Sequence, residues 1–185
     1  MKTIDKVGRP ELSVRAPHVT FEMVLRQLRR HSFAVLSTVG EDARPTSAGV
    51  TYGVSRLDRD LALYVMTRTH LQKARNIARN PNVSLVIPLT RRFLWFLPPP
   101  TIQLHGRAEI REWTDADGTD VFRHLWIGRR ILAAYQETHR RGETRICFLK
   151  IALDPVVSTY MVGSSVWALR SRMESGAAKV IIPPV

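Results

Sequence analysis

The stretch "LALYVMTRTHLQKARNIARNPNVSLVI", residues 61–87, decides the fold. Its first seven residues are almost all apolar, which is typical of a strand buried on both faces. A short helix is expected over 70–79, and it ends at Asn80 because the proline that follows does not continue a helix. Residues 82–89 are apolar again. The stretch therefore predicts a strand, a short helix and a second strand.

The first turns of this helix carry two cations, Lys73 and Arg75. A helix N-terminus is the positive end of the helix dipole and ordinarily prefers acidic side chains. One interpretation is that an anion binds between the two cations and the free backbone N–H groups. The other is that an exposed helix carries basic residues for solubility. Taken alone, the stretch favours the second interpretation.

Hairpin-forming strands dominate the rest of the chain. Upstream, Thr20 caps a helix with an apolar stripe, and strands over 32–39 and 46–54 flank the turn "GEDARP". Downstream, the expected elements are an alternating strand at 101–110, a long helix at 119–140, and strands at 144–153, 156–162 and 178–183. The buried side of the long helix is expected to comprise Val121, Phe122, Leu125, Trp126, Leu132 and Tyr135.

This order predicts a mainly β, α+β fold, because only the short helix offers a crossover between strands. The strands are expected to form an antiparallel sheet closed into a small barrel, with the helices outside. Residues 1–18 show no periodicity and are expected to form an N-terminal arm. Residues 19–185 are expected to form a single domain.

The net charge of +12 is distributed unevenly along the chain. Between Leu61 and Ala108 there is no acidic residue, whereas seven are basic: Arg68, Lys73, Arg75, Arg79, Arg91, Arg92 and Arg107. This distribution indicates a basic face that suits a phosphate-bearing small molecule as well as a polynucleotide. The single cysteine, Cys147, lies in an apolar run and is interpreted as a core residue.

The sequence also bears on partners and compartment. The segment "TRRFLWFLPPP", residues 90–100, is apolar and stiff, so we expect it to cover a pocket or an interface. The chain shows no metal-ligand spacing, no apolar run that could span a bilayer and no signal-peptide core. A cytoplasmic location is therefore expected.

The motifs "GEDARPTSAGVTYGV", "LALYVMTRTHLQKARNIARNPNVSLVI" and "IQLHGRAEI" follow one another in the order seen in a known superfamily. In this order the chain resembles the pyridoxamine 5'-phosphate oxidase-like proteins over roughly residues 19–172. Their fold is a split antiparallel β-barrel, here expected to have six to eight strands with outer helices. Members dimerise and bind FMN, the deazaflavin coenzyme F-420 or occasionally haem. The resemblance implies a homodimer with the cofactor at the subunit boundary.

The resemblance also implies a set of cofactor-binding residues, with Lys73 at the cofactor phosphate. Arg75, the second cation of the same helix, is assigned to the site with it. Gln103 is placed at the pyrimidine edge of the flavin, although a shift of register would put Thr101 there instead. The complete set is Ala48, Gly49, Val50 and Thr51 along the ring, Met66 and Thr67 from the preceding strand, and Lys73, Arg75, Gln103 and Arg172.

Departures from the family pattern argue against pyridoxamine phosphate oxidation itself. The oxidases have an arginine and a lysine at the positions of Ala48 and Gly53, and both contact the cofactor. Their C-terminal arginine–leucine–histidine stretch corresponds here to Ala168 through Arg170, so its first and last residues differ. The remaining similarity is closer to a branch that binds FMN or deazaflavin. The oligoglutamate tail of deazaflavin would suit the basic segment.

The sequence therefore predicts an oxidoreductase that uses FMN, or alternatively deazaflavin, to move hydride to or from a small organic substrate. No catalytic residue is assigned, because His105 and Tyr52 are better explained by structural roles. The alternative function is a non-catalytic binder of flavin or haem, for which His70, His105 and His139 are the conceivable haem ligands. Nucleic-acid binding rests on charge alone and is less favoured.

Overall fold

The structure, a computed structural model, describes residues 19–56, 61–89, 99–163 and 176–183. The expected arm at 1–18 lies outside these ranges, as do most of the apolar segment at 90–100 and all of 164–175. Across the described ranges, no helix is both long and apolar enough to cross a membrane.

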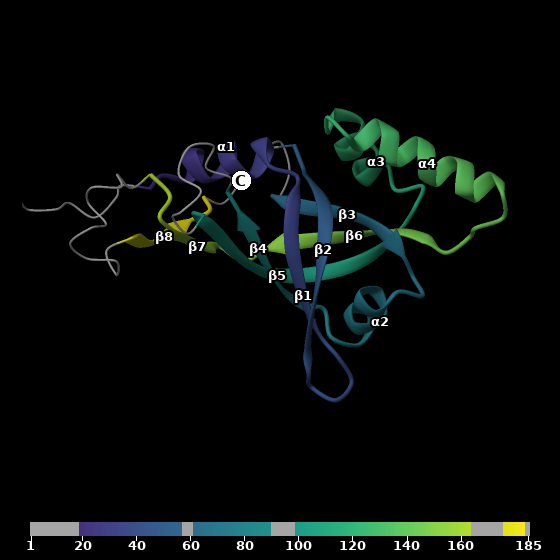
Figure 1. Cartoon of the computed structure of the whole chain (residues 1–185), viewed down its shortest axis with the longest axis horizontal. Helices are drawn as coiled ribbons and strands as arrows, with labels where there is room; N and C mark the ends of the chain where they lie inside the picture. The colour runs from purple at the N-terminus through teal and green to yellow at the C-terminus, as the bar shows by residue number, and fades with distance from the viewer. Residues whose placement is uncertain (1–18, 57–60, 90–98, 164–175, 184–185) are drawn as a thin grey trace, which may run out of the picture.

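Six antiparallel strands close into a barrel, as the sequence predicted (Figure 1). Their order around the barrel is β4-β1-β2-β3-β6-β5, and pairing of β4 with β5 closes it. Two further strands, β7 and β8, extend the sheet from the edge of β5. The strands are β1 (Phe33–Val39), β2 (Pro45–Val54), β3 (Ala62–Arg68), β4 (Asn82–Pro88), β5 (Thr101–Glu112), β6 (Ile146–Leu153), β7 (Val156–Tyr160) and β8 (Ala177–Ile181).

Alternate side chains of each strand fill the barrel, because successive residues of a strand point to opposite faces. On β5, Ile102, Leu104 and Ala108 are buried in the main core while Gln103 and His105 are exposed. β3 differs because both of its faces are covered. Leu63 and Val65 point into the barrel, and the alternate residues belong to a second apolar cluster outside it.

Four helices pack around the barrel (Figure 1). The helix α1 (Phe21–Arg30) is capped by Thr20, whose hydroxyl accepts a hydrogen bond from the backbone N–H of Met23, and it buries Val24 and Leu28 in the core. The short helix α2 (Gln72–Arg79) lies between β3 and β4 in the chain. The helices α3 (Ala116–His124) and α4 (Gly128–Arg140) supply part of the cluster that covers β3 and β6.

The prediction of one long helix at 119–140 is wrong, because two helices, α3 and α4, are separated by residues 125–127. Gly128 lies directly against the backbone carbonyl of Phe122, a contact that a Cβ would not allow. This close approach folds the start of α4 onto the last turn of α3. Trp126 stands at the break, so its side chain is 90% exposed instead of buried as expected.

Candidate cofactor site

The pairing of β2 with β3 covers only a short part of each strand. It joins Tyr52 to Val65, Gly53 to Tyr64 and Val54 to Leu63. The earlier residues of β2 pair only with β1, and residues 66–68 of β3 pair only with β6. We call the region where the two strands stop pairing the split. The predicted stretches 48–51 and 66–67 form its two edges.

The helix α2 follows β3 and brings Lys73 to the same end of the barrel. Lys73 is half-buried and lies close enough to Cys147 to lower the pKa of its thiol, although burial raises that pKa more strongly, to about 11. Cys147 is in turn the direct cross-strand neighbour of Thr67. Lys73 has no hydrogen-bond or ion-pair partner within the described ranges. Lys73, a cation without a partner in the described ranges, and Thr67 therefore both lie next to Cys147.

The N-terminus of α2 carries no side-chain cap. Its N-cap residue is Leu71, which has no side-chain oxygen to accept from the first backbone N–H groups. The helix also begins two residues later than expected, at Gln72. Lys73 is therefore in the first turn, where free N–H groups and a cation can bind one anion together.

The β2 edge of the split carries small side chains. Ala48 and Val50 point toward the barrel interior, whereas Gly49 and Thr51 lie on the outer face. A Cβ on Gly49 would lie 3.0 Å from the ring of Phe33, so the strand surface is already closely packed there. No large side chain projects from residues 48–51 themselves, so a flat ring lying along this stretch would pack beside the Phe33 ring that already covers Gly49.

The β3 edge is less exposed than the resemblance implies. Met66 is only 9% exposed, and its side chain packs in the outer cluster with residues of α3 and α4. Thr67 is 2% exposed. These two residues therefore offer mainly their backbone edge at the split, and their contact with a cofactor stays a prediction.

Gly53 explains why the lysine of the oxidases is missing. Gly53 is buried, and a Cβ at this position would overlap the side chain of Val121 on α3. The helix thus fills the space into which a lysine would extend. The replacement of the family's lysine by Gly53 is therefore consistent with the close packing of α3 on β2.

The arginines near Lys73 do not form a continuous basic track. Arg79 forms an ion pair of 2.7 Å with Glu41, and Arg68 lies 3.7 Å from a carboxylate oxygen of Glu143. Arg68 also lies over the ring of Tyr135, 5.2 Å from its centre. Arg75 is exposed.

The sequence did not reveal Asn76, which fixes α2 in place. Asn76 is fully buried, whereas the apolar Ala78 of the same helix is exposed. The Asn76 amide donates hydrogen bonds to the hydroxyls of Thr38 and Thr46, each over 3.0 Å, and accepts one from Gln72 over 2.8 Å. The sequence signal for this role was a polar residue, Asn76, at a position of the helix that faces the barrel.

Gln103 does not join the split within one chain. It lies exposed on the outer face of β5, where its side-chain nitrogen is 3.5 Å from a ring nitrogen of His105. One row of cross-strand neighbours links Gln103 to the β2 edge: Gly49, Val35, Val86, Gln103, Ser158 and Lys179. Gly49 and Gln103 are thus three strand spacings apart, roughly 14 Å.

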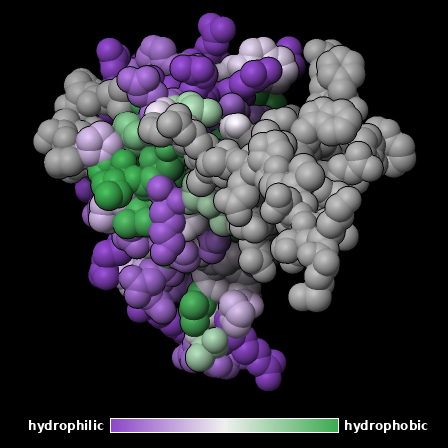
Figure 2. Space-filling model, turned by 90° about the vertical axis from the view of Figure 1, so that its left-hand side faces the viewer, coloured by the Kyte–Doolittle hydropathy of each residue, from purple (hydrophilic) through white to green (hydrophobic). Residues whose placement is uncertain are grey.

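We call this outer surface of β2, β1, β4, β5, β7 and β8 the open face. Besides that row it includes Phe33, which is 51% exposed, and the cross-strand pair Val156 and Ile181, which are 43% and 71% exposed. Figure 2 shows an apolar patch on the side of the molecule where β7 and β8 lie.

Other candidates have structural partners or lie outside the described ranges. The Tyr52 hydroxyl donates to the backbone carbonyl of Leu28 over 3.0 Å, and burial raises its pKa, so it is structural as expected. His139 packs on Trp113, with ring centres 4.4 Å apart. The described ranges contain no cluster of ligands that could hold a metal ion. Arg172, Ala168 and Arg170 lie outside those ranges.

Solved structures with the same fold include haem proteins and proteins without a stated function. A conserved hypothetical protein of Mycobacterium tuberculosis has 18% identity and a TM-score of 0.56, covering 75% of this chain and 83% of its own. The haem storage protein HutZ of Vibrio cholerae has 15% identity and a TM-score of 0.56, with coverages of 75% and 94%. A haem-binding protein of Mycobacterium smegmatis has 19% identity and a TM-score of 0.58, with coverages of 95% and 60%.

The family comparison covers the whole barrel. No curated protein matches the chain in sequence. The profile described as "Pyridoxamine 5'-phosphate oxidase" matches residues 21–153, which run from the first residue of α1 to the last residue of β6. The split, Lys73 and the barrel strands all fall within that match. The chain therefore belongs to the pyridoxamine 5'-phosphate oxidase family.

Proposed function

We propose that the protein is an FMN-dependent oxidoreductase that moves hydride to or from a small organic substrate. The observation that carries the proposal is Lys73, a half-buried cation without a partner in the described part of the chain, in the uncapped first turn of α2 beside the split. The bound flavin supplies the hydride chemistry. The protein supplies binding and orientation.

A phosphate at this position would gain three kinds of contact. The Lys73 ammonium, the backbone edge of β3 at Thr67 and the free N–H groups at the start of α2 lie at the same end of the barrel. The flavin ring would then extend along Ala48–Thr51, where side chains are small. Lys73 is better explained by a phosphate contact than by a role in solubility alone, because a lysine that serves only solubility has no reason to be half-buried.

The surrounding arginines favour FMN over deazaflavin. The oligoglutamate tail of deazaflavin needs a run of available cations, but Arg79 is paired with Glu41 and Arg68 with Glu143. Of the four basic residues on β3 and α2, Lys73 and Arg75 form no ion pair within the described ranges, and they are two residues apart on a helix, so they point in different directions. FMN ends in one phosphate and needs only the first of them.

A second copy of the chain would complete the site. Gln103, predicted to contact the flavin, lies on the open face and roughly 14 Å from the β2 edge of its own chain. Half-buried valines and small side chains in the same row would allow two open faces to pack closely. We therefore propose a homodimer in which the open face of one subunit contributes to the site of the other.

A non-catalytic binder of flavin or haem is the second candidate. A specific observation favours it, because His105 lies exposed beside Gln103 on the open face and could reach an iron at a subunit boundary. Haem binding in two proteins of the same fold makes the test worthwhile. Nucleic-acid binding is weaker, because two of the basic residues that suggested it, Arg68 and Arg79, form ion pairs.

A visible absorption spectrum of the purified protein, before and after addition of FMN or haem, tests these functions. FMN binding predicts a shifted and resolved flavin band near the free-flavin maximum, with quenched or altered fluorescence. A Soret band that shifts on titration with haem, and is lost in His105→Ala, would instead support the second candidate. No change with FMN, haem or deazaflavin would overturn the cofactor-binding proposal.

A further inference from the structure

We propose that a pocket between α1, the end of β2 and α3 binds a small organic anion, namely a carboxylate or phosphate carried on an apolar body. The pocket has a volume of about 270 Å³ and is separate from the Lys73 site in its lining residues. Leu28, Val54, Val121 and Leu125 give it an apolar wall. Four of its other lining residues are arginines or histidines: Arg29, His31, Arg56 and His124.

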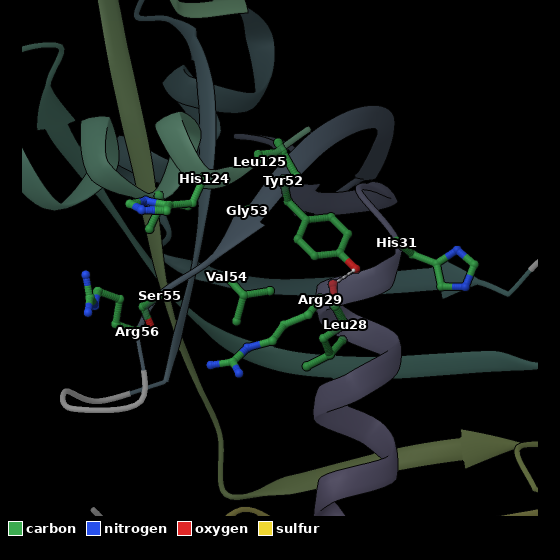
Figure 3. Close-up of a pocket in the computed structure, with 11 residues that line it drawn as sticks. Leu28, Arg29, His31, Tyr52, Gly53, Val54, Ser55, Arg56, His124 and Leu125 are labelled. Atoms are coloured by element: carbon green, nitrogen blue, oxygen red, sulfur yellow. Dashed lines mark hydrogen bonds between the residues drawn. The ribbon is translucent and has the colours of Figure 1, made fainter. Parts of the chain in front are cut away.

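The side chains of Arg29, Arg56 and His124 lie toward one side of this pocket. Figure 3 shows the Arg29 guanidinium reaching from α1 toward the side where Arg56 and His124 lie, whereas His31 points the other way. Arg29 has no ion-pair or hydrogen-bond partner within the described ranges. Arg56 and His124 share a single acid, Asp120, at 4.0 Å and 3.5 Å. Within the described ranges, the two arginines of this pocket therefore face one acidic residue, Asp120.

The uncharged groups of the pocket are already held in place. The hydroxyl of Tyr52 donates to Leu28, and the Ser55 hydroxyl accepts from the backbone N–H of Ala62 over 2.8 Å. The wall is therefore fixed by contacts between α1, β2 and β3, while the guanidinium of Arg29 is available. An anionic group with an apolar body would place its charge between Arg29 and Arg56 and its body on the leucine and valine side chains.

The test uses phenyl phosphate and benzoate as probes and benzyl alcohol as a neutral probe of similar body. Binding to the full chain is measured by ligand-observed NMR titration at physiological salt. Arg29→Gln and Arg56→Gln should each weaken anion binding about 5- to 10-fold, the lower range expected for a charge-assisted contact at an exposed site. The preferred probe identifies the headgroup as phosphate or carboxylate.

Arg30→Gln is the matched control. Arg30 follows Arg29 in the same helix and does not line the pocket, so the substitution removes the same charge outside the proposed site. It should leave the affinity unchanged within twofold. Lys73→Ala should also leave it unchanged, which separates this proposal from the cofactor site. Failure of both anions to bind, equal binding of benzyl alcohol, or equal losses in Arg29→Gln and Arg30→Gln would overturn the proposal.

Discussion

The buried amide of Asn76 donates a hydrogen bond to the hydroxyl of Thr38 over 3.0 Å, and this bond ties α2 to β1. Its second bond, to Thr46, ties the same helix to β2. Because α2 carries Lys73, the position of the proposed phosphate contact depends on a residue that touches no ligand. Asn76 is therefore a positioning residue.

Replacing Asn76 with Ala should destabilise the fold by roughly 1–3 kcal/mol, because buried hydrogen-bonding groups lose their partner. Thermal or urea unfolding measures the change. Arg75→Ala on the same helix is the control and should change stability by less than about 0.5 kcal/mol, since Arg75 is exposed. Equal stability of Asn76→Ala and the wild-type protein would show that the network does not hold α2.

The Cys147 thiol should be unreactive in the native state. Burial raises its pKa to about 11, Lys73 lowers it only in part, and the residue is 2% exposed. At pH 8 the thiol is therefore protonated, and the nucleophilic thiolate is scarce. Iodoacetamide should label the folded protein far more slowly than the guanidinium-unfolded protein. Rapid labelling of the native chain would contradict the core assignment of this cysteine.

Stability in acid should depend on Glu143, which accepts hydrogen bonds from the Arg145 side chain over 2.9 Å. These bonds, with the nearby Arg68, lower the pKa of Glu143 from 4.5 to about 2. Because the folded-state pKa is the lower one, the stabilisation is fully present above about pH 4.5 and is lost as the pH falls toward 2. Glu143→Gln should therefore lower Tm at pH 6 and lower it less at pH 3. A Tm deficit independent of pH would refute this role.

The proposed dimer should depend on the open face. Val86 is half-buried in the middle of the row that joins Gly49 to Gln103, so Val86→Glu would place a charge inside the packed interface. Sedimentation should give twice the 21.1 kDa chain mass for the wild-type protein and a monomer for Val86→Glu. Thr114→Glu adds the same charge at an exposed turn and should stay dimeric. A wild-type monomer at micromolar concentration would contradict the dimer.

The barrel could be predicted from the sequence because each strand carries its own signal. The structure buries one face of β5 and both faces of β3, which explains the alternating pattern of the first strand and the mostly apolar sequence of the second. The break between α3 and α4 could not be predicted, since it depends on Gly128 meeting the Phe122 carbonyl, a contact between helices. An apolar Trp126 fits a helix stripe whether or not anything covers it.

The candidate site was predictable only in part. Lys73 stood out because a cation is unusual in the first turn of a helix, and the structure places it beside Thr67 and the split. The predicted basic face is interrupted, because Arg68 and Arg79 form ion pairs with residues far apart from them in the sequence. The anion pocket could not be predicted from the sequence either, because Arg29, Arg56 and His124 come from three separate parts of the chain.

The most direct test of the cofactor site is an FMN titration of the apo-protein, the Lys73→Ala variant and the Arg75→Ala variant, followed by flavin fluorescence. A charge-assisted hydrogen bond to phosphate contributes about 1.5–3 kcal/mol, so Lys73→Ala should weaken FMN binding roughly 10- to 100-fold without a change in Tm. Arg75→Ala should have a much smaller effect on FMN, and salt should weaken FMN binding only mildly. Unchanged FMN affinity in Lys73→Ala would remove Lys73 from the site, and tighter deazaflavin binding that collapses with salt would contradict the choice of FMN.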